Sequence, residues 1–217
     1  MHRVMELMDF GKLSGGKPEE AERAVGIEEK PESTERSAEI KEKPKEEMKR
    51  CAEEPGLPEK GEVSGAVRYD MGQLGAVMEA WCASGLLSEE YRAAVSRKRV
   101  LHFMNGSLAE RMHTAAKAGL LWKEQPFMLG ISADRLSEEF PETEQILVQG
   151  IIDAFFEEDG EIVLLDYKTD VIESPGELAD RYRVQLDYYG EALERMTGKR
   201  VKERILYSFY LGEEVRV

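Results

Sequence analysis

The unbroken apolar stretch in EIVLLDYK, residues 161–168, limits the fold of this chain more than any other feature. Four successive large aliphatic side chains cannot alternate between a core and water, so a strand here must be covered on both faces. Helices on both sides of a sheet are the simplest cover. Asp166 and Lys168 end the stretch, and burying either charge unpaired costs roughly several kcal/mol. We therefore expect an α/β fold with partners for these charges at the end of a central strand.

The surrounding pattern predicts the order of elements. Period-two and apolar runs indicate strands over 120–132, 146–156 and 161–168, a long helix over 176–196 and a last strand over 204–211. Upstream, apolar residues at three- and four-residue steps indicate a helix over 67–85, and capping residues Ser88 and Ser107 begin two more. The predicted core is αβββαβ with a mixed central sheet. The predicted regions are an N-terminal helix of the core (1–12), a charged insertion (13–64), a helical section (65–119) and the α/β core (120–217).

Composition excludes several classes of protein. The net charge of −14 argues against a generally basic nucleic-acid-binding surface, although it does not describe a local groove. Residues 17–62 hold fifteen Glu against ten Lys and Arg and five of the eight prolines, which predicts a disordered insertion; a charged helix over 34–51 is the alternative. The two cysteines, Cys51 and Cys82, form no zinc or iron–sulfur motif. No signal peptide or membrane-spanning run is found, so we expect a cytoplasmic protein without a membrane partner.

A hairpin brings two carboxylates together. Asp159-Gly160 is a strong type I′ turn signal, and it predicts that Asp153 pairs with Asp166 and that Lys168 emerges on the same face. Two acids directly opposite each other repel, so a cation between them makes chemical sense. Oxygen ligands suit Mg²⁺ or Mn²⁺, and a metal beside a lysine suits phosphodiester hydrolysis.

A bare DxK triplet is usually an ordinary ion pair at a strand end. The hairpin register and the following helix change this interpretation. On that helix Gln185 and Tyr189 are four residues apart, hence on one face, where an amide and a phenol could contact DNA. Taken alone, they would be interpreted as the polar rim of a packing helix.

Together, the motifs GIID, LLDYKTD and QLDYY resemble those of the RecB-family nucleases within the PD-(D/E)xK superfamily, with a restriction-endonuclease-like fold. The resemblance also covers HRVMELMDF, KEQPFMLGISAD and ILYSFYLG, and is greatest to the C-terminal nuclease domains of AddA helicase–nuclease subunits. It implies that a metal is held by His2, Asp153, Asp166 and the carbonyl of Tyr167. Glu124 matches a further acidic position of that pattern. The Gly-Thr segment that precedes the histidine in the family is absent, so we expect a fragment of a longer chain without a helicase motor.

The resemblance further implies an Mg²⁺-dependent DNA exonuclease that cleaves single strands unwound by an ATP-dependent helicase, on the 3′-terminated strand, in double-strand-break repair and recombination. An AddB-like subunit is the implied partner. The alternative is a catalytically silent domain that only binds DNA or a partner. Basic clusters at 97–99 and 181–183 could line a path for the strand, although such clusters are more often solvated faces.

Overall fold

The computed structural model describes residues 1–10, 69–135, 137 and 139–217. The predicted insertion and the alternative helix over 34–51 therefore lie outside the described residues, as does Cys51. None of the helices in the described part is long and apolar enough to cross a membrane.

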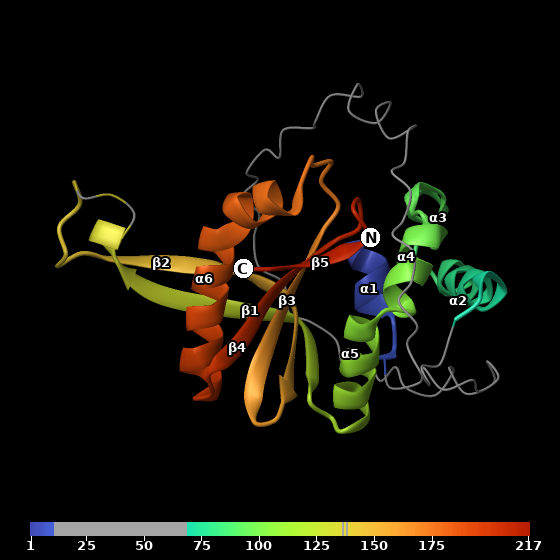
Figure 1. Cartoon of the computed structure of the whole chain (residues 1–217), viewed down its shortest axis with the longest axis horizontal. Coiled ribbons are helices and arrows are strands. Elements are labelled where there is room, and N and C mark those ends of the chain that lie inside the picture. Colours follow the sequence, from blue (N-terminus) through green and yellow to red (C-terminus); the bar gives the residue numbers. More distant parts are fainter. Residues whose placement is uncertain (11–68, 136, 138) are drawn as a thin grey trace.

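One mixed sheet forms the centre of the fold, with its strands in the order β1-β2-β3-β4-β5 (Figure 1). The strands are β1 (Leu121–Ser132), β2 (Gln145–Glu158), β3 (Glu161–Lys168), β4 (Val201–Ser208) and β5 (Glu213–Arg216). Among these described strands only the β3–β4 pair is parallel, because the helix α6 (Pro175–Thr197) crosses over between them. The predicted α/β class and the αβββαβ order are confirmed.

Strand β3 is covered on both faces, as its apolar stretch requires. Its residues from Ile162 to Tyr167 are all buried. Ile162 and Leu164 belong to the core beneath α6, whereas Val163 and Leu165 belong to the core beneath the other helices. Each fully buried aliphatic side chain contributes about 1.5–3 kcal/mol relative to exposure. The central strand thus joins two cores and holds its own C-terminal end in a fixed place between them.

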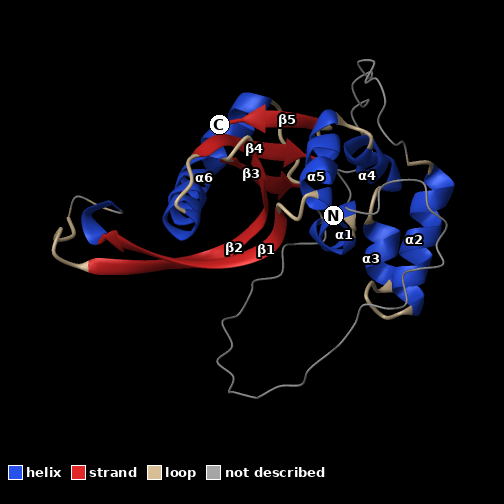
Figure 2. Ribbon diagram, turned by 90° about the horizontal axis from the view of Figure 1, so that it is seen from below, coloured by secondary structure: helices blue, strands red, loops and turns tan. Residues whose placement is uncertain are grey.

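The described helices form two layers, one on each side of the sheet (Figure 2). On one side lie α1 (His2–Leu7), α4 (Arg97–Met104) and α5 (Ser107–Lys117), and α2 (Met71–Ala83) and α3 (Glu89–Ala94) lie beyond them, farther from the sheet. Helix α6 makes up the other layer. Its N-cap is Ser174, whose hydroxyl accepts from Glu177 N–H, and its C-cap is Gly198 with φ 70°, a left-handed conformation that glycine adopts without strain.

The structure differs from the predicted elements in several places. The last predicted strand ends at Ser208 instead of residue 211, because the chain turns there and Gly212 N–H donates to Ser208 O. A short fifth strand follows, which its charged sequence EEVR did not indicate. Helix α4 lies between the two predicted helices, and α5 begins after Gly106 without a side-chain cap, since the Ser107 hydroxyl donates to Glu214 instead.

Candidate active site

The Asp159-Gly160 hairpin has the predicted turn. Both residues have positive φ, 56° and 80°, as a type I′ turn requires. Pairing runs from Glu158–Glu161 to Ala154–Leu165 in the predicted register. Asp153 and Asp166 therefore stand one step beyond the last pair, where β2 and β3 separate.

The Asp153 carboxylate of β2 forms a hydrogen bond to β3 at the point where the backbone pairing of the two strands ends. Its Oδ2 accepts from the Tyr167 backbone N–H at 2.8 Å, in place of a further rung of backbone pairing. The side chain is half-buried, so a charge-assisted hydrogen bond of this kind fixes its direction. Asp153 is thereby held beside the last residues of β3, Tyr167 and Lys168.

Helix α6 presents an amide to the two charged groups at the C-terminal end of β3, Asp166 and Lys168. Gln185 Nε2 donates to Asp166 Oδ1 at 3.3 Å and to the Tyr189 hydroxyl at 2.7 Å, and Gln185 Oε1 accepts from Lys168 Nζ at 3.1 Å. Lys168 Nζ also lies 2.6 Å from Asp166 Oδ2 and 3.9 Å from the centre of the Tyr182 ring. The amide, the phenol, the ammonium and the carboxylate form one connected network. Tyr182 is a member of this site that the sequence pattern did not single out.

Asp166 is unusually deeply buried for a carboxylate. Its side chain is only 3% exposed, and Oδ2 contacts Lys168 as an ion pair but receives no well-directed hydrogen bond within the described residues. Burial raises the pKa of Asp166 to about 6, and the negative charge of Asp153 acts in the same direction, against the opposing charge of Lys168. A buried oxygen with spare acceptor capacity beside a second acid is a place where a cation would be favourable.

Helix α1 brings His2 to the same point. The carbonyl of Tyr167 can only accept, so His2 Nε2–H donates to it, at 2.6 Å, and the same nitrogen is 3.2 Å from Asp153 Oδ2. The bond to Asp153 raises the pKa of His2, and burial opposes this rise. Three of the four ligands expected from the resemblance, namely His2, Asp153 and the Tyr167 carbonyl, thus meet directly.

Glu124 lies in β1 opposite Asp153, because the pairs Lys123–Ala154 and Gln125–Ile152 flank it. Its φ is 50°, a left-handed conformation that costs a residue with a side chain of order 1 kcal/mol or more. Burial, reinforced by the charge of Asp153, raises the pKa of Glu124. The strained backbone of Glu124 thus lies where its carboxyl is close to that of Asp153, and Glu124 belongs to the edge of the candidate site.

The alternation of the two strands reverses at Glu124 and Asp153. Trp122 and Phe155 pack in the core beneath α6, and so do Phe127 and Ile152, although strict alternation would place the second two on the opposite face. From there β1 and β2 continue as a two-stranded arm beyond the rest of the sheet (Figure 1). The site therefore lies where the regular sheet ends.

The candidate ligands fit a divalent cation in kind. Two carboxylates, a carbonyl and an imidazole provide mainly hard oxygen donors, and the buried Asp166 oxygen has free acceptor capacity. In the part of the chain described, no group of three or more His, Cys, Asp or Glu side chains is arranged to hold a metal ion. The His2 imidazole donates to the Tyr167 carbonyl, and the Lys168 ammonium lies 2.6 Å from Asp166 Oδ2 without a well-directed hydrogen bond.

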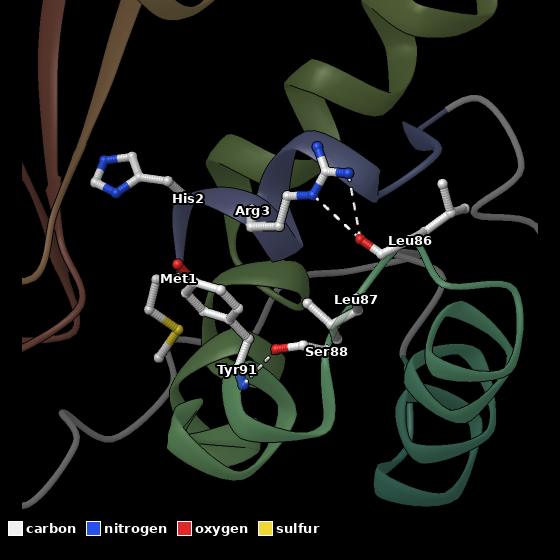
Figure 3. Close-up of a pocket in the computed structure, with 7 residues that line it drawn as sticks. All are labelled: Met1, His2, Arg3, Leu86, Leu87, Ser88 and Tyr91. Carbon is white, nitrogen blue, oxygen red and sulfur yellow. Dashed lines mark hydrogen bonds between the residues drawn. The ribbon is translucent and has the colours of Figure 1, made fainter. Parts of the chain in front are cut away.

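A surface hollow of about 540 Å³ adjoins His2 (Figure 3). It is lined by Met1, His2, Arg3, Leu86, Leu87, Ser88 and Tyr91. The His2 ring points away from this hollow, toward the strands of the sheet, and the carboxylates do not line it. Arg3 donates to the Leu86 carbonyl at 3.2 and 3.3 Å, which joins α1 to the segment after α2 beside the hollow. The hollow is therefore distinct from the carboxylate site.

The basic clusters are mostly engaged with other groups. Arg181 is 2.6 Å from Glu177, Arg183 is 3.6 Å from Asp180, and Arg99 lies over the Tyr210 ring. These contacts agree with basic residues on a solvent-exposed face at least as well as with basic residues that line a path for DNA.

The sequence of the chain was compared with those of known proteins. The sequence profile of the PD-(D/E)XK nuclease superfamily matches residues 61–215. Several ATP-dependent helicase/nuclease proteins of the AddA type are similar to the chain: one from Clostridium botulinum (strain Alaska E43 / Type E3) is 43% identical over 136 residues, 61% of this chain and 11% of the relative. Its namesake from Lachnoclostridium phytofermentans is 36% identical over 168 residues, 61% of this chain and 12% of the relative. The one from Clostridium novyi is 38% identical over 146 residues, 64% of this chain and 12% of the relative.

The chain thus spans only 11–12% of the length of these relatives. The superfamily match, in contrast, covers both acids, the lysine and the helix that supports them. Nucleases of this superfamily generally use divalent metal ions. The chain belongs to the PD-(D/E)XK nuclease superfamily.

Proposed function

We propose that this chain is a divalent-metal-dependent deoxyribonuclease domain that hydrolyses phosphodiester bonds as an exonuclease, with Mg²⁺ as the metal and Mn²⁺ as a substitute. One observation carries the proposal: Asp166 is buried beside a second acid, with Lys168 on one oxygen and Gln185 on the other. Such an arrangement is costly for stability and useful for catalysis. His2, Asp153, Asp166 and the carbonyl of Tyr167 would hold the metal. When bound, it would polarise the phosphate and lower the pKa of a bound water.

The protein groups have separate roles. Lys168 Nζ, held by Asp166 and Gln185, orients the attacking water and stabilises negative charge that develops on the phosphate. Gln185 fixes the lysine and the acid relative to each other through both ends of its amide. Tyr189 accepts from Gln185, which leaves its hydroxyl proton available for a phosphate oxygen. Glu124 adjusts the charge beside Asp153 from the strained position on β1.

The substrate class follows from the relatives, whose names describe helicase/nuclease proteins. We infer that single strands, released from duplex DNA by an ATP-dependent helicase, reach this site, and that the 3′-terminated strand is cut during double-strand-break repair and recombination. An AddB-like subunit would be the partner in the complete assembly, in the cytoplasm. These assignments rest on the resemblance to the relatives and on the carboxylate site together.

Degradation of end-labelled single-stranded DNA tests the proposal. Cleavage should require Mg²⁺ or Mn²⁺, cease in EDTA and fall by about 100-fold or more in Asp166→Ala, because that variant lacks a ligand and the partner of the lysine. Asp180→Ala is a matched control, since this acid lies on α6 and its side chain is 83% exposed. Equal cleavage by Asp166→Ala and its parent would refute the site.

The alternative is a domain that binds DNA or a partner without cleaving. It predicts metal-independent binding of single-stranded DNA that Asp166→Ala leaves unchanged, and no products at any metal concentration. The intact set of Asp153, Asp166 and Lys168, joined by Gln185, favours the enzyme.

A further inference from the structure

Helix α1 depends on distant contacts for its position. It has six residues, with no side-chain N-cap, no acid in its first turn and no base in its last. A helix this short is unstable alone. The described chain leaves it after Phe10 and resumes at Tyr69, on the way to α2. Whatever sets the place of α1 on the sheet therefore also sets the place of His2.

Lys123 holds the C-terminal end of this helix. Its Nζ donates to Glu6 O at 2.5 Å and to Met8 O at 2.6 Å, two carbonyls that the last turn of a helix leaves without an internal partner. The ammonium also lies 5.7 Å from the centre of the Phe10 ring. A cation at this end is favourable for the helix dipole as well. One side chain of β1 thus fixes the end of α1 opposite to His2.

The two ends of α1 are mechanically connected. A helix of six residues is a rod of about 9 Å, so a shift at Met8 is passed on to His2. Ligand positions that bind metal tolerate displacements of only about 0.2–0.5 Å. Lys123 is also the neighbour of Glu124, whose strained backbone lies opposite Asp153. Strand β1 therefore contacts the site twice, directly through the acid and indirectly through the lysine.

We propose that Lys123 is a positioning residue, which places His2 on the Tyr167 carbonyl and Asp153 by holding the C-terminal carbonyls of α1. The metal-binding consequence rests on the proposed function, whereas the placement of His2 does not. A simpler role, in which Lys123 only stabilises the fold, predicts no change in His2 once the protein is folded.

Lys123→Met separates these roles, because methionine keeps most of the apolar stem beside Phe10 and removes the donor. The first readout needs no metal: in EDTA, the NOE between the rings of His2 and Tyr167, whose centroids are 6.2 Å apart, should weaken at least twofold. The second is Mn²⁺ affinity by calorimetry without DNA, which should fall about 10-fold or more, as for other supporting residues of metal sites. Lys123→Arg retains donors and should recover part of both signals.

Lys202→Met is the matched control. Lys202 lies on the same sheet and contacts Glu158 at 2.8 Å and Asp159 at 3.3 Å, at the hairpin end of β3 away from Asp166. It should leave the NOE and the Mn²⁺ affinity unchanged. A folded Lys123→Met with the parental NOE would overturn the proposal; if that variant does not fold, Lys123→Gln is judged by the same measurements. Failure of the parent to bind Mn²⁺ would count against the proposed function, and the NOE would still decide the role of Lys123.

Discussion

Asp166→Asn should make the metal-free protein more stable while abolishing its nuclease activity. The pKa of this acid rises from 3.8 to about 6 on folding, chiefly because the carboxyl is buried. A difference of about two units at ~1.4 kcal/mol each means that ionised Asp166 costs the fold about 3 kcal/mol well above pH 6. Asparagine has nearly the same shape and cannot ionise, so this cost disappears in the variant.

The sign of the pH dependence follows from the raised pKa. The folded protein binds the Asp166 proton more tightly than the unfolded chain does, so this group destabilises the parent increasingly as pH rises from about 4 to about 7. The advantage of Asp166→Asn should therefore be largest near pH 8, at about 3 kcal/mol, and about half as large near pH 5. Water that reaches the site would reduce the stability advantage of Asp166→Asn at both pH values, and the advantage would still be larger near pH 8 than near pH 5.

Urea unfolding in EDTA at the two pH values measures this difference. Asp180→Asn, at an exposed position on the same helix as Gln185, should change the unfolding free energy little at either pH. Adding Mg²⁺ should stabilise the parent and not Asp166→Asn, because only the parent retains both acids. An asparagine variant that is less stable than the parent near pH 8, or whose advantage does not decrease near pH 5, would refute the reasoning.

Three further outcomes are expected. Lys168→Met should reduce DNA cleavage about 100-fold or more, measured with end-labelled single strands, while far-UV circular dichroism remains that of the parent. Arg111→Met should cost about 1–2 kcal/mol in urea unfolding near pH 7, because the bidentate contact with Glu158, at 2.8 and 2.9 Å, is only partly exposed to solvent. That contact lowers the pKa of Glu158 to about 2, so the difference should shrink as pH falls from about 4.5 toward 2. Phe103→Ala should cost about 3–5 kcal/mol in the same assay, since the ring is 1% exposed and packs against four other aromatic rings.

Local chemistry explains what could be predicted from the sequence. Asp-Gly determines the turn, the turn determines the register, and the register brings Asp153 beside Asp166, so a short-range signal was sufficient. The apolar stretch of β3 likewise required helices on both faces, and both layers are present. The short β5 could not be predicted in this way, because its residues owe their strand conformation to pairing with β4.

The contacts that complete the site are all long-range. His2 meets Tyr167 across 165 positions of sequence, and Lys123 meets Glu6 across 117, and no periodicity records either contact. The resemblance to the RecB family singled out His2 and Glu124, but it gave no role to Lys123 or Tyr182. Their roles follow from packing, since each is directed by a neighbour on another element.

The unfavourable features of the fold are concentrated at one point. A buried acid with a raised pKa, a second acid on the neighbouring strand and a left-handed glutamate all lie near the C-terminal end of β3, where β1 and β2 stop alternating regularly. Natural sequences tolerate such conflicts chiefly where function requires them. The remainder of the sheet supplies the stability that offsets them, through two cores that share β3. The same burial that makes Asp166 costly without metal would make a bound cation favourable, and this reversal is why stability without metal and activity with metal should change in opposite directions.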